Sequence, residues 1–131
     1  MPGMVRALAL SFAILTLGCT AHVAGTLQVD GVPFRPIHCR SGQALGFEGV
    51  ELADENAARL RLAQSLDGTS MTVYFPPGGT VGDSLGACST LHAVPGTGVI
   101  DGVKNLEGDA TLSCLTPPHT ARGSVTFKDC H

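Results

Sequence analysis

Short segments of alternating apolar and polar residues, each bounded by glycine, proline or aspartate, recur along this chain of 131 residues. The clearest is 58–64, where Leu60 and Leu62 fall on one side of an extended chain and Arg61 on the other. Alternation with period two is typical of a strand with one buried and one solvated face. Nine segments have a strand signal: 26–29, 32–38, 46–52, 58–64, 70–75, 89–94, 99–103, 110–115 and 123–128. The fold class that they predict is all-β, an antiparallel β-sandwich or partly open barrel of about eight short strands.

One segment also has helix-forming residues. Residues 54–66 contain glutamate, alanine, arginine and leucine, which favour helices. In a helix, however, Arg61 and Gln64 would share a face with Leu60, so the strand interpretation is preferred.

Turn residues divide the segments. Asp30-Gly31 is a two-residue turn that favours a tight hairpin. Aspartates next to glycine are interpreted as turn residues, and further breaks are expected at 76–79, 95–96, 107–109 and 117–118. The aspartates in question are Asp30, Asp67, Asp101 and Asp109.

Five cysteines constrain the fold further, and one of them, Cys19, lies in the N-terminal segment. The remaining four form an even set, which indicates two disulfides in an oxidising compartment. A four-thiolate zinc site requires close pairs of cysteines, whereas successive members of this set are 49, 26 and 16 residues apart, so we expect no metal. The set is Cys39, Cys88, Cys114 and Cys130.

The last two strands bear on the pairing. If 117–120 form a turn, Cys114 lies opposite roughly Arg122, and Cys130 lies about 26 Å further along the strand. A disulfide needs Cα atoms within about 7 Å. Cys39 then pairs with either Cys130 or Cys114, and we prefer Cys39 with Cys130 and Cys88 with Cys114.

The first residues have the three parts of an export signal: a positive charge at Arg6, an uncharged apolar run over 7–17, and the small residue Gly18. The run is too short for a membrane-spanning helix, which needs roughly 20 apolar residues. Leu15-Thr16-Leu17-Gly18-Cys19 resembles the lipobox of bacterial lipoproteins, although leucine is more usual three residues before the cysteine, where Thr16 stands. An ordinary secretory signal with a cysteine near its cleavage site is the alternative.

This resemblance implies three regions: a helical lipoprotein signal peptide over 1–18, a lipidated Cys19 with a tether over 19–25, and a single β-sandwich domain over 26–131. Two or three acyl chains on Cys19 would make the membrane its first partner, and an envelope protein is the second expected partner. The implied location is the bacterial cell envelope, facing the periplasm or the outside. Without Arg6, seven basic residues stand against eleven acidic ones, so we expect no nucleic-acid partner.

The two ends of the domain resemble the small actinobacterial lipoprotein antigens. The similar stretches are Thr26-Leu27-Gln28-Val29-Asp30-Gly31, the cysteine Cys39, and Val125-Thr126-Phe127-Lys128-Asp129-Cys130. The resemblance implies a lipid-anchored sandwich without established catalysis, exposed at the envelope and able to trigger lipoprotein-sensing receptors of a host. Residues 76–106 have no counterpart in it.

Motifs of catalysis and cofactor binding are incomplete in this sequence. Residues 96–100 begin like a dinucleotide fingerprint, but Asp101 stands where glycine is required. His38 and His131 flank two cysteines of the preferred disulfide, and the plainer interpretation is two exposed imidazoles rather than a metal site. We therefore expect no catalytic residues, no cofactor and no enzymatic activity.

Two functions remain as hypotheses. The first is a non-catalytic structural or protein-binding module that uses a sheet face or the loop over 76–86, because loops on rigid scaffolds often carry binding. The second is a carrier or sensor of an apolar ligand, with a cavity between the sheets. The expected cavity residues are Phe34, Phe47, Leu60 and Phe127.

Overall fold

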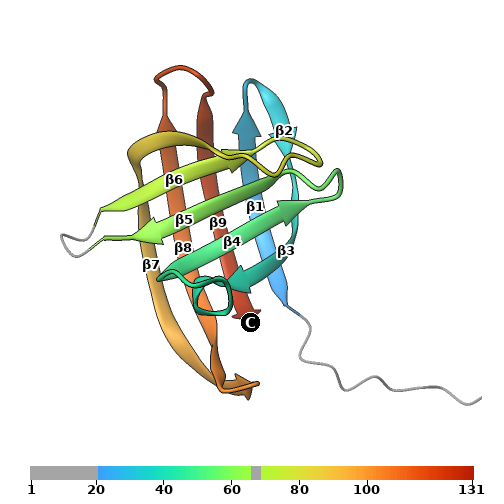
Figure 1. Cartoon of the computed structure of the whole chain (residues 1–131), viewed down its shortest axis with the longest axis vertical. Helices are drawn as coiled ribbons and strands as arrows, with labels where there is room; N and C mark the ends of the chain where they lie inside the picture. The colour runs from blue at the N-terminus through green and yellow to red at the C-terminus, as the bar shows by residue number, and fades with distance from the viewer. Residues whose placement is uncertain (1–20, 66–68) are drawn as a thin grey trace, which may run out of the picture.

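The computed structural model describes residues 21–65 and 69–131, and these form one antiparallel sheet (Figure 1). Neighbouring strands lie in the order β2-β1-β9-β8-β7-β6-β5-β4-β3. The elements are β1 (His22–Val29), β2 (Val32–Phe34), β3 (Pro36–Ser41), the 3-10 turn η1 (Gly42–Leu45), β4 (Gly49–Asp54), β5 (Arg59–Gln64), β6 (Ser70–Phe75), β7 (Asp83–Ile100), β8 (Val103–Cys114) and β9 (Ala121–Cys130).

The sheet curls into a nearly closed barrel, which confirms the all-β prediction and selects the barrel over the sandwich. Its two edge strands, β2 and β3, are separated in the chain by Arg35 alone, so the edges are held together covalently. β3 also lies beside β1. Within the described residues, no hydrogen-bonded ladder joins these two strands, and a seam therefore runs between them.

The inward positions of the strands fill the barrel with aliphatic side chains. Leu60 and Leu62 have no exposed surface, while Arg59 and Arg61 of the same strand are partly exposed. The predicted alternation over 58–64 is therefore confirmed, and the helical alternative over 54–66 is wrong. Further core residues come from both sides of the seam: Leu27, Phe34, Val50, Leu52, Leu91, Leu112, Val125 and Phe127.

Two disulfides join the strands, in the pairing preferred from the sequence. Cys39 of β3 is bonded to Cys130 of β9, and Cys88 of β7 is bonded to Cys114 of β8. The first links the edge strand β3 to a strand on the other side of the seam. Both of its sulfurs lie in the core, where Cys39 is 4% exposed and Cys130 is 0% exposed.

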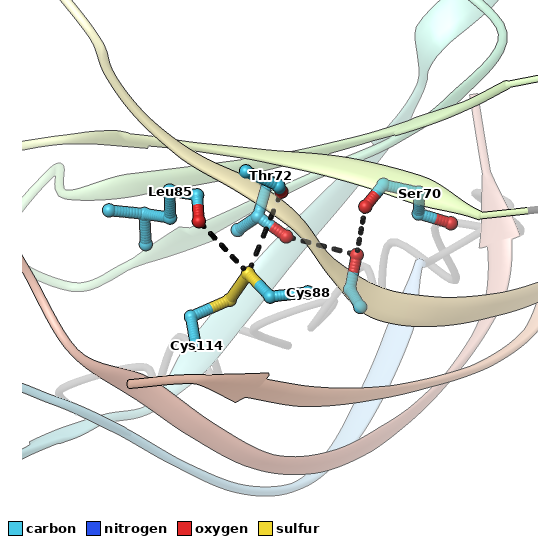
Figure 2. Close-up of a disulfide and its surroundings, with 7 residues drawn as sticks. Ser70, Thr72, Leu85, Cys88 and Cys114 are labelled. Carbon is cyan, nitrogen blue, oxygen red and sulfur yellow. Dashed lines mark hydrogen bonds between the residues drawn. A yellow bond between two sulfur atoms is a disulfide. The ribbon is translucent and has the colours of Figure 1, made fainter. Parts of the chain in front are cut away.

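A small buried polar network lies next to the second disulfide (Figure 2). The Thr72 hydroxyl donates to the Ser89 hydroxyl at 2.9 Å, and that hydroxyl donates to the Ser70 carbonyl at 3.1 Å. The disulfide sulfur of Cys88 lies 3.4 Å from the Leu85 carbonyl oxygen. Because this sulfur has no proton, we interpret that approach as a contact and not as a hydrogen bond.

The first strand begins earlier than predicted. Residues 22–25 belong to β1 and pair with β9 from His22↔Lys128 to Gly25↔Val125, so the expected tether over 19–25 and the domain start at residue 26 are wrong there. The physical reason is that β9 is ten residues long and provides backbone partners for this stretch. The expected signal helix and Cys19 lie outside the described residues.

Two expected breaks lie inside strands. Residues 95–96 fall within β7, where a register shift between Pro95 and Val99 accommodates them, and 107–109 fall within β8. Asp109 is therefore a strand residue paired with His92, not a turn residue. The predicted single strand over 99–103 is instead divided by the turn at Asp101-Gly102, with Val99 and Ile100 at the end of β7 and Val103 at the start of β8.

The turns at Asp30-Gly31 and Asp101-Gly102 have positive φ at both residues. This conformation suits a tight two-residue hairpin, so both aspartates are turn residues as predicted. Asp67 lies outside the described residues.

Candidate functional site

Three connections meet at the upper end of the barrel in Figure 1, and one histidine ties them together. His119, from the β8–β9 connection, approaches Asp30 of the β1–β2 turn with Nδ1 at 2.6 Å and Asp83 at the start of β7 with Nε2 at 2.9 Å. The Thr120 backbone N–H donates to the other oxygen of Asp30 at 2.9 Å. Segments that are far apart in the sequence are thereby held in fixed relative positions. We call this triad of Asp30, Asp83 and His119 the histidine clamp.

The electrostatics of the clamp favour a charged imidazole. Hydrogen bonding to Asp30 raises the pKa of His119, and Asp83 adds to the rise. Hydrogen bonds from His119 and from the Thr120 backbone lower the pKa of Asp30. An imidazolium can donate from both nitrogens, which suits two carboxylate acceptors. The His119 ring also meets Tyr74 edge to face, with ring centroids 4.9 Å apart.

Exposed aliphatic side chains surround the clamp. Val32 is 63% exposed, Val81 is 78% exposed and Leu115 is 61% exposed. Val81 and Leu115 lie on two of the clamped connections, and Val32 is the first residue of β2, directly after the β1–β2 turn. Beside Leu115 is an open hollow of about 280 Å³, also lined by Gln28, Thr120 and Arg122. We call the surface made by these three aliphatic residues the loop-end surface. It combines a fixed backbone with apolar side chains that no neighbour covers.

A second cluster fixes the connection that carries Val81, which spans residues 76–82. Arg59 donates from Nη2 to the Gly79 carbonyl at 3.0 Å and lies 4.2 Å above the ring of Phe75. Beside it, Arg61 donates to the buried carboxylate of Glu51 at 2.6 Å. These contacts hold the connection against the outer face of β5 and β6.

The cavity predicted for an apolar ligand is not formed by its four expected residues. Phe34, Leu60 and Phe127 belong to the packed core, with exposures of 3%, 0% and 4%. Phe47 lies on the outside, where the guanidinium of Arg61 is 5.6 Å from its ring centre. The interior of the barrel therefore contains side chains at the positions where the ligand was expected.

The other candidate residues do not form a reactive group. Across residues 21–65 and 69–131, no group of three or more histidine, cysteine or acidic side chains could hold a metal ion. His38 is exposed, and Nδ1 of His131 is buried without a hydrogen-bond partner. None of the helical segments in the described part is long and apolar enough to cross a membrane.

No protein-family model, no curated protein and no solved structure matches this chain. The candidate site therefore rests on its geometry. Sequence reasoning assigned Asp30 to a turn and placed His119 in another turn, but it did not bring the two together. The one signal that pointed there was a histidine directly after Pro117-Pro118, in a connection between two well-marked strands.

Proposed function

We propose that this protein is a non-catalytic, lipid-anchored module of the cell envelope that presents its loop-end surface to a protein partner. The observation that carries the proposal is the histidine clamp, which fixes the connections that carry Val81 and Leu115 and the turn directly before Val32. Apolar groups that are fixed before binding lose little conformational entropy on association. Rigid scaffolds that present exposed loop residues are a common design for recognition.

The proposed location has separate support. Two disulfides are typical of an oxidising compartment outside the cytoplasm. Cys19, within the lipobox-like stretch, precedes the first strand residue His22 by only three positions. β1 starts at the end of the barrel opposite the loop-end surface, so an anchor at Cys19 would leave that surface facing away from the membrane (Figure 1).

The alternative function, a carrier of an apolar ligand, has less support. Its expected pocket is filled by Phe34, Leu60 and Phe127, and the small pocket of about 120 Å³ at the other end of the barrel has Glu48, Gln64 and Lys104 in its wall. Two larger hollows, of about 530 and 510 Å³, are open depressions on the surface. Ligand pockets for drug-sized apolar molecules enclose most of the ligand within a mainly apolar wall.

The anchor is tested by intact mass and detergent partitioning of the wild type beside Cys19→Ala, expressed in its own host. We expect a mass gain of diacylglycerol size that is absent from the variant, together with loss of the variant from the detergent phase. An unmodified, soluble wild-type protein would refute the lipid anchor.

The binding surface is tested by site-specific photocrosslinking in the same host. A crosslinker at Val81 or Leu115 should give the same discrete protein adduct, and His119→Ala should weaken it. The matched control is a crosslinker at Thr111, which is exposed on the barrel wall. Adducts of equal yield from Thr111, or no adduct from either loop position, would contradict the proposal.

A further inference from the structure

The longest hairpin extends beyond the rest of the barrel at the end where β1 begins (Figure 1). β6 pairs with β7 only between residues 83 and 89, and β9 pairs with β8 only as far as Leu106↔Cys130. Residues 95–105 therefore have ladder partners only within their own hairpin, and we call them the terminal ribbon. The ribbon and the expected anchor at Cys19 lie at the same end.

The terminal ribbon exposes aliphatic side chains near its tip. Val99 is 58% exposed and Ile100 is 38% exposed, and Val94, directly before the ribbon, is 57% exposed. Asp101 and Lys104, also exposed, are the charged residues of the ribbon. A two-stranded hairpin on its own is marginally stable, but here Asn105 is 2% exposed and lies against Gly96 and Gly98 of the facing strand, so the two strands of the ribbon pack against each other.

Strand register gives the reach of the ribbon relative to that of the anchor. The tip at Gly102 is four residues beyond Leu106, which is about 13 Å at 3.3 Å per residue. His22 pairs with Lys128, two residues before Cys130 and so about 7 Å above the level of Leu106. Three residues from His22 back to Cys19 span at most about 11 Å.

A fully extended tether thus places Cys19 about 4 Å beyond the level of Leu106, whereas the ribbon tip extends about 13 Å beyond it. Strand tilt shortens both lengths by a similar factor and keeps their order. With acyl chains on Cys19 embedded in a bilayer, the tip lies at or below the plane of attachment.

We propose that the terminal ribbon contacts the bilayer surface and acts as a second membrane contact beside the lipid anchor. The tip turn with Asp101, and Lys104 beside it, would lie among the headgroups, and the neighbouring aliphatic side chains of Val99 and Ile100 would contact the boundary between headgroups and acyl chains from that level. The inference rests on the lipidation of Cys19 in the proposed function. It adds an orientation, with the barrel standing on its ribbon and the loop-end surface held away from the membrane.

The absence of tryptophan from the chain allows a direct test. Ile100→Trp places a single tryptophan at the ribbon tip, and Leu115→Trp places one at the opposite end as the matched control. Each full-length lipidated variant is inserted into phosphatidylcholine vesicles whose acyl chains carry bromine near the headgroup. For Ile100→Trp we expect at least a twofold loss of tryptophan fluorescence and a shift to shorter wavelength, with neither change for Leu115→Trp.

The failures of the two proposals are distinguishable. Intact mass before insertion reports lipidation by itself, so an unlipidated wild type overturns the anchor whatever the vesicles show. In protein with the correct lipid mass, unquenched fluorescence from Ile100→Trp, or quenching no stronger than that of Leu115→Trp, overturns the ribbon contact. Cys19→Ala combined with Ile100→Trp should lose the quenching, and quenching that persists would overturn the argument from tether length.

Discussion

Removing the Cys39–Cys130 disulfide should destabilise the barrel more than removing the Cys88–Cys114 disulfide. A disulfide limits the freedom of the unfolded chain, and the effect grows with the length of the closed loop. The cysteines of the first bond are 91 residues apart and those of the second 26 residues apart. The chain-entropy relation then gives a contribution to the free energy of unfolding of about 4.6 kcal/mol for the first bond and about 3.5 kcal/mol for the second.

The difference matters because a domain of this size has a total stability of about 5–15 kcal/mol. The two variants are Cys39→Ala/Cys130→Ala and Cys88→Ala/Cys114→Ala, unfolded in urea and followed by circular dichroism. Both should show a steeper dependence on urea than the wild type, because a less constrained unfolded chain exposes more surface. Each variant keeps one disulfide, so reduction of Cys88→Ala/Cys114→Ala breaks only the Cys39–Cys130 bond and reduction of Cys39→Ala/Cys130→Ala breaks only the Cys88–Cys114 bond. These reduced variants retain the sulfur atoms of the bond that is broken and so separate the effect of the bond from that of the lost atoms.

A loss below about 2 kcal/mol for Cys39→Ala/Cys130→Ala would refute the reasoning, as would a smaller loss than that of the second variant. The unfolded chain would then not be limited by loop closure. The position of the bond gives an independent check by hydrogen exchange. Because Cys39 lies on the edge strand β3, its loss should increase exchange in β3 more than in β8.

Further predictions concern a histidine, two glycines and an arginine. His119→Gln should lower stability by about 1 kcal/mol between roughly pH 4 and 6.5 in pH-dependent thermal unfolding. The difference in stability between the wild type and the variant should shrink above about pH 6.5, as His119 with its raised pKa loses its proton. It should also shrink below about pH 4, as the carboxylate of Asp30 is protonated. A difference that does not change with pH would refute the clamp. Gly108→Ala should cost more than about 2 kcal/mol in urea unfolding, because its Cβ would overlap the His92 carbonyl oxygen of β7. Gly102→Asn should change stability little, because there is open space around Gly102 and asparagine tolerates its left-handed φ. Equal losses of stability in Gly108→Ala and Gly102→Asn would contradict the steric argument. Arg61→Met should cost about 2–3 kcal/mol by leaving the buried carboxylate of Glu51 without its closest partner, and adding Glu51→Gln should restore part of that loss in the same assay.

Local sequence signals predicted the elements whose neighbours lie close in the chain. The alternation over 58–64 and the turn at Asp30-Gly31 each depend on a few adjacent residues, and both are formed as predicted. These signals do not depend on the partner strand. The all-β class follows from these local signals, because most of the chain consists of alternating segments or of turn residues.

The boundaries of β7 and β8 depend on the partner strand, and local signals predict them wrongly. Pro95 and Gly108 resemble breaks, since both residue types are common in turns. In the barrel, Pro95 lies at a register shift, where its missing N–H is tolerated. Gly108 lies where the neighbouring backbone leaves no room for a side chain. Proline and glycine can each lie in a turn or inside a strand, and only the pairing with the neighbouring strand shows which of the two positions they occupy.

The histidine clamp could not be predicted for a related reason. His119 and Asp30 are 89 residues apart, and His119 and Asp83 are 36 residues apart. No local pattern links them, because β1 pairs with β9, the last strand of the chain, only through a long-range ladder. The disulfide pairing, by contrast, was partly accessible, because the length of one hairpin and the reach of a covalent bond disfavour Cys114 with Cys130 and leave two pairings, of which the preferred one is formed.

Strand direction assigns different roles to the two ends of the barrel. β1 runs away from the expected anchor, so its turn to β2 lies at the end of the barrel far from that anchor. β9 is antiparallel to β1, so it begins at this far end and ends beside the start of β1. The connections at the far end are then those that follow β1 and β4 and those that precede β7 and β9, and His119 joins three of these four. The β7–β8 hairpin must lie at the near end for the same reason. A new N-terminus placed in the β1–β2 turn by circular permutation would exchange these roles, since the anchor would then be attached beside the clamp and the terminal ribbon would face away from the membrane.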